Sequence, residues 1–99
     1  MKSIVHMVIF CLKHDKNSRQ EKQFLDDSEK ILSSITGVKD FKVCRQVSPK
    51  NDFDFGFTME FENKSSYEEY NNHPSHVDYV ENRWLKEVDR FLEIDFEKL

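Results

Sequence analysis

The chain has 99 residues, a mass of 11.9 kDa and a net charge of −4, which predicts a single small domain spanning residues 1–99. Lys and Arg do not cluster, and no apolar stretch approaches the roughly 20 residues of a membrane-spanning helix, so neither a nucleic-acid partner nor a membrane partner is expected. The two cysteines form no C-x-x-C pair, and no small-residue cleavage site follows the apolar start. We therefore expect reduced thiols, no signal peptide and a cytoplasmic location.

The segment from Ile4 to Leu12 is predicted to be a strand with apolar side chains on both faces. With a period of two, one face carries Ile4, His6, Val8, Phe10 and Leu12, and the other carries Val5, Met7, Ile9 and Cys11. Such a strand is typical of the centre of a sheet that is covered on both sides. His6 is the one polar residue on its face.

The first helix is signalled by Ser18 and Glu21, which fit a capping box. An apolar stripe follows at Phe24, Leu25, Ile31, Leu32 and Ile35. Gly37 is expected to end this helix. A second strand is predicted at about residues 38–47, and the segment "SPKND" after it is predicted to be a turn.

A third strand is predicted at residues 53–62, because apolar side chains take every second position. These side chains are Phe53, Phe55, Phe57, Met59 and Phe61. The period of two over this length indicates a strand, and we expect this row to form part of the core.

A second helix is expected to begin with Ser65 and Glu68 as another capping box and to break near Pro74. Because proline suits the first turn of a helix, a new helix is predicted over residues 75–88. Its apolar stripe would be Val77, Val80, Trp84 and Val88. A last strand is predicted at residues 91–96.

The order β-α-β-β-α-β predicts an α+β, ferredoxin-like protomer with strands one and three in the centre and the helices on one face. Cys11 and Cys44 would then lie two strands apart, too far for a disulfide. The uncovered sheet face mixes apolar and polar side chains, which favours association. We therefore expect a homodimer whose sheet faces meet, forming a dimeric α/β barrel.

Four stretches carry a resemblance to a known family: "IVHMVIFCLK", "VSPKND" with "FGFTMEFEN", "YNNHPSHVDYV" and "LEIDFE". Together they resemble the stress-responsive dimeric α/β-barrel (Dabb) domain family over nearly the whole chain. The resemblance implies a ferredoxin-like protomer and a dimer formed through the sheets. Many members have no known activity, and some plant members are linked to stress tolerance and form large stable oligomers.

Other members of that family are plant polyketide cyclases, which close a ring without a cofactor by means of a Tyr–His pair. By the motif, Tyr70 matches this tyrosine, His76 matches the histidine, and His6 matches a further pocket histidine. Where the cyclases have apolar lining, this chain has Asp26, Asp27, Ser28 and Asn71. A cavity for a long apolar chain is therefore not expected.

The chemistry of Tyr70, His76 and His6 fits acid–base work. A histidine on an apolar face needs a partner, because an unpaired buried polar group costs about 1–3 kcal/mol. An imidazole can take a proton α to a carbonyl group, and a phenol can donate to the developing enolate oxygen. The resulting hypothesis is a cofactor-free pocket for a small carbonyl or phenolic compound. We expect its lining to include Val8, Phe10, Phe24, Phe57, Met59, Tyr79 and Val80.

Three alternatives stay open. The three polar groups could satisfy one another and fix the helix on the sheet, in a non-enzymatic stress-associated structural or oligomeric protein. The pocket could bind a ligand without chemistry. A metal site would use His73 and His76 with Asp78 and His6, but no H-E-x-x-H pattern is present and Pro74 disturbs the helical face, so no metal is expected.

Overall fold

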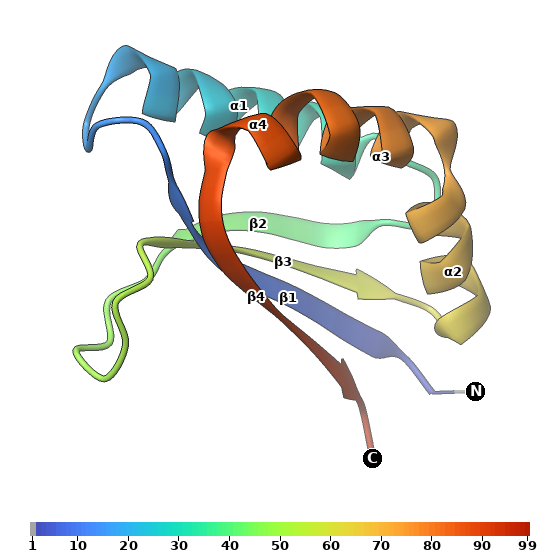
Figure 1. Ribbon diagram of the computed structural model, residues 1–99. Coiled ribbons are helices and arrows are strands. Elements are labelled where there is room, and N and C mark those ends of the chain that lie inside the picture. Colours follow the sequence, from blue (N-terminus) through green and yellow to red (C-terminus); the bar gives the residue numbers. More distant parts are fainter. Residues whose placement is uncertain (1) are drawn as a thin grey trace.

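The strands form one antiparallel sheet, and the helices cover one face of it (Figure 1). The computed structural model describes residues 2–99. Its elements are β1 (Ile4–Leu12), α1 (Arg19–Ser33), β2 (Lys39–Arg45), β3 (Phe55–Phe61), α2 (Lys64–Asn72), α3 (Pro74–Tyr79), the π-helical turn η1 (Val80–Trp84), α4 (Leu85–Glu87) and β4 (Val88–Glu97). The strand order is β2-β3-β1-β4, with β1 and β3 in the centre. The ferredoxin-like α+β fold is therefore confirmed.

The core lies between the sheet and the helices and is largely aromatic. Phe10 is fully buried, and its ring centroid lies 4.7 Å from that of Phe57, 5.1 Å from that of Trp84 and 6.1 Å from that of Phe24. These tilted and edge-to-face pairs join β1 and β3 to η1 and α1. The alternation of apolar side chains along β1 and β3 thus places one row of each strand under the helices, as the sequence indicated.

The opposite sheet face is apolar over β1 and β4. The register pairs Val5 with Phe96, Met7 with Ile94 and Ile9 with Leu92, so these six side chains share one face. Leu92 and Phe96 are 51% and 54% exposed. We call these six residues the outer apolar face. Figure 1 shows all the helices on the other side of the sheet.

The start of α1 agrees with the expectation in part. The Ser18 hydroxyl accepts a hydrogen bond from the Glu21 N–H at 3.2 Å. However, the Glu21 carboxylate accepts from the Asn17 N–H at 3.1 Å and not from the cap residue itself. Gly37, with φ +93°, lies in the turn after Ser34, the C-cap of α1. The helix therefore ends before the glycine, and the glycine permits the turn into β2.

The predicted start of the second helix was wrong. Asn63, and not Ser65, is the N-cap of α2, and its side-chain oxygen accepts from the Ser66 N–H at 2.9 Å. Asn is among the strongest N-cap residues, because its short side chain reaches the free N–H groups of the first turn. The Ser65–Glu68 pair therefore begins two residues too late to cap the helix.

The break at Pro74 is confirmed. His73 ends α2 and caps α3, with extended backbone angles, and Pro74 takes the first position of α3. The helix predicted over residues 75–88 was wrong in two respects. It contains a π-helical turn, in which the Leu85 N–H donates to the Val80 carbonyl, and it gives way to β4 already at Val88.

The π-helical turn changes which side chains face the core. Because a π turn holds an extra residue, a single 3.6-residue period does not describe this segment. Val77, expected on the buried stripe, is 43% exposed, whereas Tyr79 is 3% exposed. The Tyr79 hydroxyl and the Ser28 hydroxyl form a buried hydrogen bond of 2.6 Å that joins α3 to α1.

The two cysteines lie on separate, non-adjacent strands. Cys11 is buried in β1 and Cys44 is exposed in β2, with β3 between the two strands, and both thiols are free. None of the helices within residues 2–99 has the length and apolar character needed to cross a membrane.

The two candidate caps of α2 can be separated by mutation. Asn63→Ala should lower the free energy of unfolding by about 1 kcal/mol, because it removes the cap of the Ser66 N–H. Ser65→Ala, the matched control, should change it by less than about 0.5 kcal/mol. Urea unfolding followed by circular dichroism measures both. Equal losses in the two variants would contradict the assigned cap.

Candidate functional site

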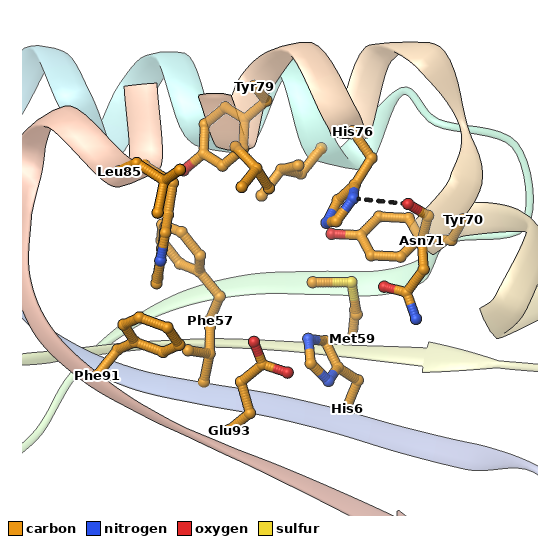
Figure 2. Close-up of a pocket in the computed structure, with 14 residues that line it drawn as sticks. His6, Phe57, Met59, Tyr70, Asn71, His76, Tyr79, Leu85, Phe91 and Glu93 are labelled. Carbon is orange, nitrogen blue, oxygen red and sulfur yellow. Dashed lines mark hydrogen bonds between the residues drawn. The ribbon is translucent and has the colours of Figure 1, made fainter. Parts of the chain in front are cut away.

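A cavity of about 140 Å³ lies between the sheet and the helices. Figure 2 shows side chains from β1, β3 and β4 below it and from α2, α3, η1 and α4 above it. Leu85 and Phe91, which line its outer end, are 60% and 46% exposed. The cavity is therefore apolar inside and opens beside β4 and α4.

The sequence-predicted lining residues fall into two groups. Val8, Phe57, Met59, Tyr79 and Val80 lie on the cavity wall. Phe10 and Phe24 do not, because they pack against each other and against Trp84 in the core. Their place on the wall is taken by residues that the sequence reasoning did not select, among them Trp84, Phe91 and Glu93.

His6 has partners other than the expected ones. Its Nδ1 lies 2.5 Å from a carboxylate oxygen of Asp95, its neighbour across the β1–β4 pair, and 3.1 Å from the Tyr67 hydroxyl. The same hydroxyl donates to the second Asp95 oxygen at 3.0 Å. We expected Tyr70 and His76 to be the hydrogen-bond partners of His6, but Asp95 and Tyr67 take these places. Tyr70 lies beside His6 with a ring-centroid separation of 6.5 Å.

The His6–Asp95–Tyr67 network fixes the imidazole. In the neutral ring, with Nδ1–H donating to the carboxylate, the lone pair is on Nε2, and this nitrogen has no hydrogen-bond partner in the part of the chain that the structure describes. The sequence carried one signal for this network. A period of two through the last strand places Asp95 on the face of the sheet that β4 shares with His6.

The Tyr70 hydroxyl is buried but unpaired within residues 2–99. The residue is 2% exposed and lies among Phe61, at a centroid distance of 5.0 Å, and His76, at 4.4 Å. In the described chain, every side-chain oxygen or nitrogen that is fully inaccessible has a hydrogen-bond partner. The Tyr70 oxygen has none, so it must be accessible from the cavity that the residue lines. Burial raises the pKa of Tyr70, so the hydroxyl stays protonated and can donate.

His76 is held as a neutral base. Its Nδ1–H donates to the backbone carbonyl of Asn71 at 3.2 Å (Figure 2), which leaves the lone pair on Nε2. Burial lowers the pKa of His76 below its ordinary value, because the imidazolium would lose its hydration, although the bond to Asn71 opposes this. An imidazole with a depressed pKa and an oriented lone pair is suited to accept a proton near neutral pH.

The other candidate residues have local roles. The His73 ring accepts from the Ser75 N–H at 3.1 Å and so caps α3. Asp78 binds the Asn82 amide at 2.7 Å. Across residues 2–99, no three His, Cys, Asp or Glu side chains come together in a way that could hold a metal ion.

Comparison with known proteins places the chain in a family. The family model described as Stress responsive A/B Barrel Domain (Dabb) matches residues 4–98. A Dabb family protein with a ferredoxin-like fold from Mesorhizobium loti is 52% identical, over 100% of this chain and 99% of that chain, with a TM-score of 0.98. The chain therefore belongs to the stress responsive A/B barrel domain family, which confirms the resemblance seen in the sequence.

More distant solved structures share the fold. A dimeric protein of unknown function from Bacteroides fragilis is 22% identical over 97% of this chain and 96% of that chain, with a TM-score of 0.70. A hydroxynitrile lyase from Passiflora edulis is 13% identical over 99% of this chain and 94% of that chain, with a TM-score of 0.85. At such identities the likeness concerns the fold alone. None of the curated proteins compared with the chain matches it.

The protonation state of His76 can be measured directly. We expect its pKa, followed by NMR of the ring C–H groups, to lie below the 6.5 of a free histidine because burial disfavours the charged form. Between the two pKa values the unfolded chain binds more protons at this site than the folded chain. The free energy of unfolding should therefore fall as pH decreases through the window below 6.5, and this fall should be smaller in His76→Gln. A pKa of 6.5 or above would contradict the lowering of the His76 pKa by burial.

Proposed function

We propose that this Dabb domain binds a small, single-ring carbonyl or phenolic compound in its cavity and transfers a proton on it without a cofactor. The observation that supports the proposal most strongly is the Tyr70 hydroxyl, which is buried among apolar rings, has no partner within the described residues and lines the cavity. Because no inaccessible polar side-chain atom in the described chain lacks a partner, this hydroxyl is open to the cavity. A ligand oxygen that accepts from it would gain a hydrogen bond with a net value of about 0.5–1.5 kcal/mol.

The size of the cavity supports a ligand with one ring. The volume of about 140 Å³ is close to that of an engineered cavity of roughly 150 Å³ in another protein that binds benzene. The walls supplied by Phe57, Met59 and Trp84 suit an aromatic ring. The extended chain of a polyketide would not fit in this volume.

The proposed chemistry uses His76 as base and Tyr70 as hydrogen-bond donor. The His76 Nε2 lone pair takes a proton from the carbon next to the ligand carbonyl. The electrons of that C–H bond form a C=C bond, and the carbonyl π electrons move onto the oxygen, which accepts from the Tyr70 hydroxyl. Because Tyr70 stays protonated and His76 stays neutral, both groups are in the required state before the ligand enters.

His6 has a supporting place in this proposal. Asp95 and Tyr67 hold its ring on the cavity wall, with Nε2 as the acceptor nitrogen. A phenolic proton or a water molecule bound to the ligand could be oriented by this nitrogen. The arrangement is that of an imidazole whose tautomer is set by a carboxylate.

The domain is also proposed to act as a homodimer that buries the outer apolar face. Six side chains on β1 and β4 form this face and no helix within residues 2–99 covers them. A small chain gains stability when such a surface leaves water. The protein from Bacteroides fragilis, which has the same fold, is described as dimeric. In a dimer formed in this way the helices and the cavities would lie on the outside.

Tyr70→Phe tests the proposed chemistry. The measured reaction is exchange of the methyl protons of acetophenone, a single-ring ketone, for deuterium in D₂O, followed by proton NMR. The parent should accelerate the exchange above the buffer rate, and Tyr70→Phe and His76→Gln should each lower the acceleration at least about tenfold, since positioned acid–base groups typically contribute 10²–10⁴. Exchange at the buffer rate in the parent, with acetophenone bound, would contradict the proton transfer.

Tyr67→Phe is the matched control for stability. It removes the hydroxyl that binds His6 and Asp95, so it should lower the free energy of unfolding by about 1 kcal/mol. Tyr70→Phe removes a hydroxyl with no bond to the described chain and should change stability by less than about 0.5 kcal/mol. A loss of about 1–2 kcal/mol in Tyr70→Phe would instead favour the structural role.

The dimer is tested by light scattering at micromolar concentration. The parent should have twice the 11.9 kDa mass of the chain, and Phe96→Asp should reduce it to a monomer because a carboxylate would be buried in the interface. Val77→Asp, which alters an exposed apolar residue on α3, should stay dimeric. A monomeric parent would overturn the dimer.

A further inference from the structure

The charges around the cavity are of one sign. Within the described residues, Glu93 is the one acidic residue that lines the cavity, and no Lys or Arg lines it. His76 is kept neutral by burial, which lowers its pKa. Asp95, directly behind His6, is paired with that imidazole. A ligand in the cavity therefore meets the Glu93 carboxylate and no Lys or Arg on the described part of the cavity wall.

Glu93 points into the cavity and is free to bind. Figure 2 shows its carboxylate rising from β4 into the space between Phe91 and His6. Its strand neighbour is Val8, which also lines the cavity. Within residues 2–99 its carboxylate makes neither an ion pair nor a side-chain hydrogen bond, unlike Glu87, which binds Arg83 and His14.

The carboxylate lies within electrostatic reach of Tyr70. Burial is the main cause of the raised pKa of Tyr70, and the negative charge of Glu93 adds to it. The two groups therefore face the same cavity. One is a hydroxyl of a buried residue without a partner in the described chain, and the other is a carboxylate without a counter-ion there. Because Glu93 is exposed, water screens its charge, and its ion pair with a ligand is expected to be a modest one.

The two arginines next in sequence to cavity-lining residues, Arg83 and Arg90, are paired with carboxylates other than Glu93. Arg90 lies 3.0 Å from the Asp52 carboxylate. Arg83 binds the Glu87 carboxylate at 2.6 Å and the Asp27 carboxylate at 3.0 Å. Its guanidinium is thereby held between η1 and α1 and does not line the cavity. An anionic ligand would find no Lys or Arg on the described cavity wall to replace its hydration, whereas a cationic ligand would find Glu93 at the open end.

We propose that Glu93 makes this cavity selective for a cationic ligand, namely a single-ring phenolic or carbonyl compound that carries an amine. The ammonium group binds the Glu93 carboxylate and lies against the exposed ring of Phe91. The aromatic ring of the ligand packs on Phe57 and Met59, and its phenolic or carbonyl oxygen accepts a hydrogen bond from the Tyr70 hydroxyl. This inference rests on the proposed function, since it assigns a charge class to the ligand of the same cavity.

Three probes that share a 4-hydroxyphenyl ring separate the contributions of ring and charge. They are tyramine, which is cationic, p-cresol, which is neutral, and 4-hydroxyphenylacetate, which is anionic. The chain has a single tryptophan, and because Trp84 lines the cavity, its indole N–H signal in a ¹H–¹⁵N NMR titration reports binding at this site. We expect tyramine to bind more tightly than p-cresol, and p-cresol more tightly than 4-hydroxyphenylacetate.

Glu93→Gln should weaken the binding of tyramine roughly fivefold, as expected for the loss of one partly exposed ion pair. The affinity for p-cresol should stay unchanged. Glu29→Gln, which removes the same charge from the exposed side of α1, should change neither the affinity for tyramine nor that for p-cresol. If p-cresol binds the parent as tightly as tyramine and Glu93→Gln has no effect on tyramine, the charge selectivity is overturned and the ligand site remains. If none of the three probes shifts the Trp84 signal, the proposed ligand site and the selectivity are both overturned.

Discussion

The hydrogen bonds that occupy Nδ1 of His6 determine the character of the whole site. A histidine on the helix-facing side of β1 needs a partner, and Asp95 and Tyr67 supply it. Because they do so, neither Tyr70 nor His76 is required to satisfy His6. The Tyr70 hydroxyl and the His76 Nε2 atom thus remain available to the cavity, with no competing bond inside the described chain.

The helical segment above the sheet keeps the cavity open. Pro74 ends α2 and starts α3, which places Tyr70 and His76 on either side of the break. The π-helical turn that follows then brings Trp84 to the cavity wall while Tyr79 stays fixed to Ser28. A regular helix would have presented a different set of side chains. Irregular helical turns of this kind are often found at functional sites.

Much of the fold could be predicted from the sequence, because periodicity and proline are local signals. The rows of alternating apolar residues in β1 and β3 and the break at Pro74 are direct consequences of strand geometry and proline chemistry. The cap at Asn63 and the π-helical turn at Val80 were missed. The first depends on which of several polar residues reaches the free N–H groups, and the second is a departure from the regular period that no pattern of apolar residues announces.

The composition of the site was harder to predict than its location. The motif brought Tyr70, His76 and His6 to one region, but the bonds between Asp95, Tyr67 and His6 depend on the register of β1 against β4, which a single sequence does not state. Glu93 was missed for the same reason. Phe10 and Phe24 were predicted to line the cavity but lie in the core. An aromatic residue on an inward face fits either a cavity wall or a filled core, so the sequence could not distinguish the two.

The proposed chemistry and the proposed charge selectivity both require that the space beside Tyr70 and His76 binds a ligand. Intermolecular nuclear Overhauser effects between bound p-cresol and the protein test it most directly, because they report which rings the ligand touches. If p-cresol binds in the cavity, we expect contacts to the ring protons of Tyr70, His76 and Trp84. Contacts confined to the outer apolar face, for example to Phe96 and Leu92, at saturating p-cresol would contradict it.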